Sequence, residues 1–161
     1  MTVVILGADP GVTTGLCLLT LDYASRTLAL AITSRSVFAC NAGAAYGLAE
    51  YLIESNDGPA TIIGAGERFV PGRGAGATGP QAAATRQVIT DLSSLPVPWK
   101  WRSAAEVKVW ATDERLKKAH LFAMTNKSID ARDACRHAIY CATRDCGMPD
   151  PLSRRQADGP S

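Results

Sequence analysis

The sequence predicts an α/β domain in which a mixed sheet is flanked by helices. The first part of the chain carries three apolar runs separated by short connections, a pattern typical of antiparallel strands. Further along, apolar runs alternate with segments of helical periodicity, which indicates that parallel strands also take part. The hydrophobic fraction of 47% and the charged fraction of 20% are ordinary for a globular chain. The length of 161 residues suits one domain.

The antiparallel part of the sheet begins with residues 2–9, whose unbroken apolar run is typical of a strand covered on both faces. A turn at Pro10-Gly11 connects this strand to a second one over residues 14–21. Residues 26–32 have the composition of a third strand. The first three strands are therefore expected to be antiparallel.

A helix and another buried strand are expected next. Asn41 can cap the helix, and the polar residues 55–58 end it. Its apolar residues recur at helical spacing, namely Ala45, Leu48, Ala49 and Leu52. Residues 60–66 then form a buried strand that places Glu67 at its end.

The glycine-rich residues 71–79 predict a flexible loop. Pro80 suits the first turn of the helix that follows, which extends to about Leu95. The apolar stripe of this helix suits either the core or a dimer contact, and consists of Ala84, Val88, Leu92 and Leu95. Residues 97–101 predict a short strand whose two tryptophans face the same side, toward the core.

Hydroxyl side chains mark the starts of the remaining helices. Ser103 and Glu106 fit a capping box, and Thr112 begins another helix. Ser128 caps the last long helix, which is expected to run to about Cys146.

Residues 1–146 are expected to form the folded domain, and residues 147–161 a loose C-terminal tail. The formal net charge of +2 does not by itself indicate a polyanionic partner, although basic residues gather between Lys100 and Lys118. The five cysteines include no Cys-x-x-Cys pair, which favours a reducing cytoplasm. A signal peptide and a membrane-spanning stretch are both absent from the sequence, so a cytoplasmic protein with no membrane partner is expected.

Acidic residues stand where predicted elements end or begin. Asp9 and Glu67 each end an apolar strand, and Asp130 and Asp133 lie on one face at the start of the last helix. Four carboxylates brought together would repel one another unless divalent cations held them, and hard oxygen ligands suit Mg²⁺ or Mn²⁺. Two such ions commonly catalyse the attack of water on a phosphodiester.

Three of these four acidic residues have a simpler explanation when each is taken alone. Asp130 or Asp133 could complement the dipole of the last helix, and Glu67 could form a surface ion pair with Arg68. Asp9 is harder to explain in this way, because buried carboxylates are rare without a partner. The metal-site hypothesis therefore depends on the whole set and on its order along the chain.

Four motifs, and their order along the chain, resemble those of the RuvC-type Holliday junction resolvases of the RNase H-like superfamily. ILGADPGVTTG (5–15) resembles their first-strand motif, and DARDACRHAIYCA (130–142) resembles their last helix. IIGAGERF (62–69) resembles their glutamate strand, and EVKVWATDERLKKA (106–119) resembles a segment that carries two functional lysines. The resemblance spans residues 3–146 and is greatest to the phage-encoded branch, which would place the protein in a bacterial cytoplasm.

The resemblance implies an RNase H-like nuclease that binds branched DNA, chiefly four-way junctions, as a homodimer and leaves 5′-phosphate and 3′-hydroxyl ends. Two Mg²⁺ ions per active site, replaceable by Mn²⁺, would be bound by catalytic carboxylates. These would be Asp9, Glu67, Asp130 and Asp133. Lys108 would approach the scissile or a neighbouring phosphate, and Lys117 or Lys118 would take a second basic role.

Residues after the glutamate strand are candidates for further DNA contacts. The family commonly has an aromatic residue here that packs at the junction centre, and Phe69 is the candidate, with a strand-end core position as its alternative. Arg68 and Arg73 could bind phosphates or belong to a surface loop. His137, one turn after Asp133, could assist near a metal or be structural; zinc is rejected because no further ligand has suitable spacing.

Three other functions are compatible with parts of the sequence. The same chemistry could act on flaps or replication forks, because the carboxylates set the reaction whereas loops and dimer geometry set the substrate. A non-catalytic nucleic-acid-binding module is disfavoured by the presence of all four acidic positions. A nucleotide-binding protein with the phosphate loop DPGVTTG (9–15) would need a second related domain, for which the chain has no room.

Overall fold

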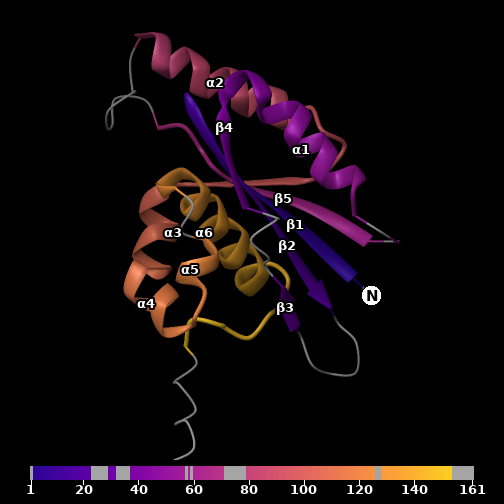
Figure 1. The fold of residues 1–161 in the computed structure, drawn as a ribbon, viewed down its shortest axis with the longest axis vertical. Coiled ribbons are helices and arrows are strands. Elements are labelled where there is room, and N and C mark those ends of the chain that lie inside the picture. Colours follow the sequence, from indigo (N-terminus) through magenta and orange to yellow (C-terminus); the bar gives the residue numbers. More distant parts are fainter. Residues whose placement is uncertain are drawn as a thin grey trace, which may run out of the picture.

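A mixed β-sheet forms the centre of the computed structural model (Figure 1). Within the described residues its strands are β1 (Thr2–Asp9), β2 (Thr13–Asp22), β3 (Ala29–Ala31), β4 (Val37–Asn41), β5 (Ala60–Glu67) and β6 (Trp99–Arg102). β1 pairs antiparallel with β2 and parallel with β5, and β6 lies parallel beside β5. β3 and β4 pair antiparallel with opposite ends of β2. The N-terminal strands are thus antiparallel, as the sequence predicts.

The structure describes residues 2–22, 29–31, 37–56, 58, 60–70, 79–125 and 128–153. Helices cover both faces of the sheet in this part of the chain (Figure 1). They are the short 3₁₀ helix η3 (Ala42–Ala44) and the α-helices α1 (Ala45–Glu54), α2 (Gly79–Ser93), α3 (Ala104–Trp110), α4 (Asp113–Lys118), α5 (Phe122–Thr125) and α6 (Ile129–Arg144). α1 and α2 cover one face, and α6 lies across the other with α3, α4 and α5 beside it.

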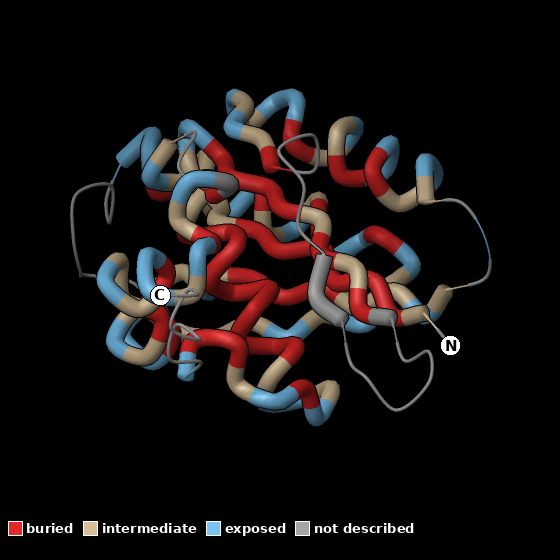
Figure 2. The backbone as a smooth tube through the Cα atoms, turned by 60° about the horizontal axis from the view of Figure 1, so that its bottom comes forward, coloured by how far each residue is buried: buried red, intermediate tan, exposed pale blue. Residues whose placement is uncertain are grey.

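Alternation along β1 sends its side chains into two separate cores. Val3 and Ile5 pack on the side of α6, whereas Leu6 and Ala8 pack on the side of α1 and α2. α2 joins this second core through Val88 and Leu92, and Leu95, two residues beyond the end of the helix at Ser93, packs there too. Figure 2 shows the buried backbone in the middle of the molecule, with exposed positions on the outer sides of the helices. Both faces of the sheet are covered, which explains why β1 is apolar from Val3 to Ala8.

Glycines on β5 make room for the two tryptophans of β6. A Cβ atom would lie 2.3 Å from the Trp99 ring at Gly64 and 2.2 Å from the Trp101 ring at Gly66. The two indoles stack with centroids 4.6 Å apart and an interplanar angle of 9°. They pack against the core under α1 and α2, which confirms the sequence prediction that both face one side.

Side-chain caps start the helices where the sequence predicts them. Ser103, Thr112 and Ser128 each accept a hydrogen bond from the backbone N–H three residues later. Asn41 also acts as a cap, but the helix that it opens is η3, which leads directly into α1. Such caps typically contribute about 1 kcal/mol each to stability.

Residues 148–152 differ from the loose tail that the sequence predicts. Gly147 has a positive φ of 71°, a conformation that glycine adopts easily and that turns the chain back after a helix. The Met148 N–H then donates to the Ala142 carbonyl at 3.0 Å. Met148 and Leu152 are buried in the same core as α6. The remainder of the expected tail, residues 154–161, lies outside the described residues.

The helices of the described part are short. α6 has 16 residues, and no described helix is both long and apolar enough to cross a membrane. α5 has 4 residues and is not predicted from the sequence, because a single helical turn carries too little periodicity to be recognised.

Candidate metal centre

Two carboxylates stand side by side at one edge of the sheet because β1 and β5 are parallel neighbours. Ala8 pairs with Gly66 in the register of the two strands, so the next residues, Asp9 and Glu67, reach the same level. Side chains alternate between the two faces of a strand, and both carboxylates fall on the face that packs against α6.

Two glycines allow α6 to approach this edge closely enough to add a third carboxylate. A Cβ atom at Gly7 would lie 2.2 Å from the Ala134 carbonyl oxygen, and one at Gly15 would lie 1.9 Å from that of Asp130. Any other side chain would push the helix away from the sheet. The close contact brings Asp133, in the second turn of α6, beside the two strand-end carboxylates.

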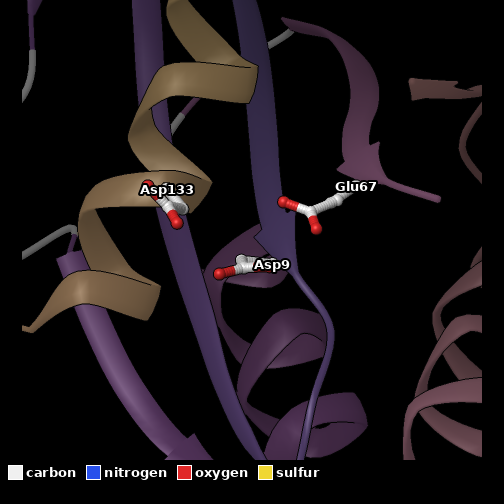
Figure 3. Close-up of side chains that lie close together, drawn as sticks. All are labelled: Asp9, Glu67 and Asp133. Atoms are coloured by element: carbon white, nitrogen blue, oxygen red, sulfur yellow. The ribbon is translucent and has the colours of Figure 1, made fainter. Parts of the chain in front are cut away.

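Asp9, Glu67 and Asp133 point toward one another from three separate elements (Figure 3). Each contributes one carboxylate oxygen to a group in which all the atoms lie within 4.8 Å of one another. Carboxylate oxygens bind Mg²⁺ or Ca²⁺ at about 2.0–2.6 Å, so one divalent cation can contact all three. The structure therefore brings together three of the four acidic residues that the sequence singled out.

Asp130 does not belong to this group of three. It lies in the first turn of α6, half-buried, and the carbonyl of the same residue lies against Gly15. Burial raises the pKa of Asp130, and the charges of Asp133 and Glu67 raise it further. Asp130 is thus close enough for the charges of the cluster to raise its pKa, but its carboxylate does not converge with the other three.

Lys108 of α3, which the resemblance assigns to a phosphate of the substrate, lies beside the cluster. Its ammonium lies 2.7 Å from Asp133 Oδ2 and 3.2 Å from Glu67 Oε2. Burial alone would lower the pKa of Lys108, but these two carboxylates and Asp9 raise it above its ordinary value. The lysine therefore stays charged and offsets part of the negative charge of the cluster.

Within the cluster, Asp9 has the largest pKa shift. Burial, followed by the charges of Glu67 and Asp133, raises the pKa of Asp9 from 3.8 to about 8. Lys108 opposes this effect but does not cancel it. A carboxylate with so high a pKa lacks the counter-charge that its position requires, and a divalent cation would supply that charge.

His137 also faces the cluster from α6. Its side chain is 1% exposed, and its Nε2 lies 3.7 Å from Glu67 Oε2, too far for a hydrogen bond. His137 Nε2 has no hydrogen-bond partner in the described structure. Burial alone would raise the pKa of Glu67, but the nearby imidazole and the Lys108 ammonium lower it below its ordinary value. The position of His137 fits an auxiliary group better than a remote structural one.

Arg136 is a contact of the cluster that the sequence analysis did not identify. Its Nη1 donates to Asp133 Oδ1, and its side chain is 9% exposed. The signal was present as an arginine three residues after an aspartate on one helix face. Such pairs are common on exposed helix surfaces, so spacing alone does not distinguish this buried one.

The two lysines predicted for the second basic role lie on the exposed surface of α4. Lys118 pairs with Glu114 at 2.9 Å, and the Lys117 ammonium lies 4.8 Å from the centre of the Phe122 ring. Both are available to a partner in solution, and neither reaches the carboxylates as Lys108 does.

The other predicted DNA contacts follow β5. Arg68 is exposed, and Phe69 is half-buried with the Arg86 guanidinium 4.6 Å from its ring centre. Arg86 belongs to α2, so this aromatic ring bridges the strand end and a helix of the opposite face. Arg73 lies outside the described residues.

Comparison with known proteins gives a structural match only. No protein-family model matches the sequence, and no curated protein matches it significantly. The fold is similar to that of T. thermophilus RuvC, solved in complex with a Holliday junction substrate, with a TM-score of 0.56 and 16% sequence identity. The similarity covers 89% of this chain and 96% of that one. This chain therefore has a RuvC-like fold, which confirms the fold class that the sequence predicts.

Proposed function

We propose that this protein is a metal-dependent endonuclease that cleaves four-way DNA junctions. The observation that carries the proposal is the convergence of Asp9, Glu67 and Asp133 with Lys108 at one edge of the sheet. The fold supports it, because the similar structure of T. thermophilus RuvC is a complex with a Holliday junction. The four residues come from four different elements, so a simple helix-surface ion pair does not account for them.

The residues present fit a divalent cation. Three hard oxygen donors within 4.8 Å suit Mg²⁺ or Mn²⁺, and the buried His137 Nε2 beside them has no hydrogen-bond partner in the described structure. Asp9, Glu67 and Asp133 would hold the ion, with Asp130 nearby as the candidate ligand for a second one. Bound ions of this kind activate water as a nucleophile and stabilise the leaving oxygen of a phosphodiester.

The chain's own groups then have distinct tasks. Asp9, Glu67 and Asp133 would hold the cation, and they must be deprotonated to do so. Lys108 already lies among these carboxylates, and its ammonium stabilises negative charge that develops on the phosphate. Hydrolysis in this site needs no covalent enzyme intermediate and yields 5′-phosphate and 3′-hydroxyl ends.

Basic and aromatic residues outside the cluster would hold the DNA. Lys117, Lys118 and Arg68 are exposed and suit phosphate contacts, as does Arg73. Phe69 follows Glu67 by two residues and suits stacking on an unpaired base. Two like-polarity cuts in a two-fold symmetric junction require two active sites, so the acting form would be a homodimer.

The test is cleavage of a labelled four-way junction in Mg²⁺ by the wild type and by Asp9→Asn. We expect paired symmetric nicks that disappear in the variant while junction binding is retained. Asp91→Asn is the matched control. Asp91 is an acidic residue of α2 whose carboxylate accepts a hydrogen bond from Gln87, and α2 covers the face of the sheet opposite α6. Absence of cleavage by the wild type on junctions, flaps and forks, in Mg²⁺ and in Mn²⁺, would refute the proposal. Preferential cleavage of flaps or forks would keep the chemistry and change the substrate.

A further inference from the structure

Arg136 has an unusually complete set of partners for a buried arginine. Its Nε donates to the Ala111 carbonyl at 2.7 Å. Its Nη1 donates to Asp133 Oδ1, and its Nη2 donates to Asp113 Oδ1. With the side chain only 9% exposed, these contacts hold the guanidinium in one orientation. The fork shape of the group allows it to bind two carboxylates and a carbonyl at once.

Arg136 and Lys108 contact different oxygens of the Asp133 carboxylate. Asp133 Oδ1 accepts from Arg136, whereas Oδ2 faces the Lys108 ammonium at 2.7 Å. The Asp133 side chain is 5% exposed, so it has no solvent partner that could take over from Arg136. One oxygen is therefore committed to the arginine, and the other is directed toward the site.

The far end of the contact is anchored on α4. Asp113, the first residue of α4, also accepts from Arg132 Nη1 at 3.2 and 3.0 Å. Thr112 caps the same helix. The start of α4 is thus joined to α6 through two arginines, one of which continues to Asp133.

We propose that Arg136 is a positioning residue that aligns Asp133 as a metal ligand, and that Asp113 acts on Asp133 through Arg136. The inference rests on the metal centre proposed above. An exposed ion pair at this spacing would stabilise the helix only slightly and would not orient either side chain. Here both partners are buried and the arginine is held from three sides, which is the arrangement of groups that orient metal ligands from behind.

Charge and geometry make opposite contributions to metal affinity, so the choice of variant matters. Removing the positive charge beside a ligand would strengthen cation binding, whereas releasing the ligand from its orientation would weaken it. Arg136→Lys retains the charge and removes the planar fork. If orientation is the role of Arg136, Arg136→Lys weakens metal binding although it keeps the positive charge.

The experiment is a titration of the full chain with Mn²⁺ by calorimetry, combined with thermal melting to establish folding. Partners that orient metal ligands typically change affinity by about 10–100-fold, and we expect a loss of about 10-fold for Arg136→Lys. Asp113→Ala leaves Arg136 in place and is expected to weaken Mn²⁺ binding by several fold. In the double variant the combined loss of Mn²⁺ affinity should be smaller than the product of the two single losses, because both substitutions act through one guanidinium.

Arg115→Lys is the matched control. Arg115 also donates to a backbone carbonyl, that of Trp110, and to a carboxylate, that of Asp150, both at 2.6 Å. Its substitution should lower thermal stability without changing Mn²⁺ affinity.

The outcomes separate this inference from the proposed function. Wild-type affinity in a folded Arg136→Lys variant, or fully independent effects of the Arg136 and Asp113 substitutions, would overturn the positioning role and leave the metal centre intact. An equal loss in Arg115→Lys would also overturn it, because the effect would then be general destabilisation. If the wild type shows no Mn²⁺ binding that Asp9→Asn abolishes, the metal centre itself is wrong and the positioning role falls with it.

Discussion

Replacing Asp9 by asparagine should stabilise the metal-free protein, and by more at pH 8 than at pH 5. Burial and the charges of Glu67 and Asp133 raise the pKa of Asp9 from 3.8 to about 8. The folded protein therefore binds a proton at Asp9 that the unfolded chain has already lost. Because the folded state holds more protons between about pH 4 and pH 8, the free energy of unfolding falls as the pH rises through this window. Asparagine keeps the shape of the side chain and removes the charge.

The size of the effect follows from the shift. At about 1.36 kcal/mol per pKa unit, Asp9 costs the folded wild type roughly 1.7 kcal/mol at pH 5 and about 5 kcal/mol at pH 8. Both figures are upper limits because Asp9 is not fully buried. We expect the advantage of Asp9→Asn to grow by about 1–3 kcal/mol between the two pH values.

The assay is urea unfolding of both proteins at pH 5 and pH 8 in the presence of a chelator. Comparing the variant with the wild type at each pH removes the contribution of all other titrating groups. Added Mn²⁺ should reverse the order at pH 8, because the ion stabilises only the protein that binds it. An advantage that is absent, or equal at both pH values, would show that Asp9 is not the buried, uncompensated carboxylate described here.

Two further predictions concern the approach of α6 and the role of the lysine. Gly15→Ala should destabilise the protein by about 1–3 kcal/mol or more in thermal melting, because its Cβ would lie 1.9 Å from the Asp130 carbonyl. Gly47→Ala is its control in α1, where a Cβ meets nothing within 4 Å, and a loss of similar size there would contradict the explanation. Lys108→Met should raise Mn²⁺ affinity, because it removes a competing cation from Asp133. The same variant should slow junction cleavage by about 100-fold at saturating metal, so parallel losses of binding and cleavage would show that the lysine only maintains the structure.

Local sequence signals were sufficient for most of the longer elements of the fold, but not for β4 or α5. The apolar run of β1 and the turn at Pro10-Gly11 placed the first hairpin, because strand burial and turn formation depend on adjacent residues. Ser103 and Ser128 marked helix starts correctly, since a cap bonds only to the backbone three residues later. Sequence signals were weak where one residue or one turn decides the outcome, as for α5 and for the turn at Gly147.

The acidic residues themselves were also visible in the sequence, because a charge at the end of a buried apolar run needs an explanation. Asp9 and Glu67 were identified on that ground, and the structure places them side by side. The resemblance to RuvC-type resolvases added Lys108, and the structure places its ammonium beside Glu67 and Asp133. The order of motifs along the chain thus determined the fold class and most of the candidate site.

Only the tertiary structure decided which side chains converge. Asp130 and Asp133 share a helix face, yet only Asp133 joins the cluster. The position of α6 against the sheet, which its close contacts with Gly7 and Gly15 fix, decides this. Arg136 became part of the site for the same reason, because its partners come from α4 and from the segment before it. Such contacts depend on strand register, helix packing and burial together. Each of these depends on residues that are far apart in the sequence, so a local sequence pattern cannot predict it.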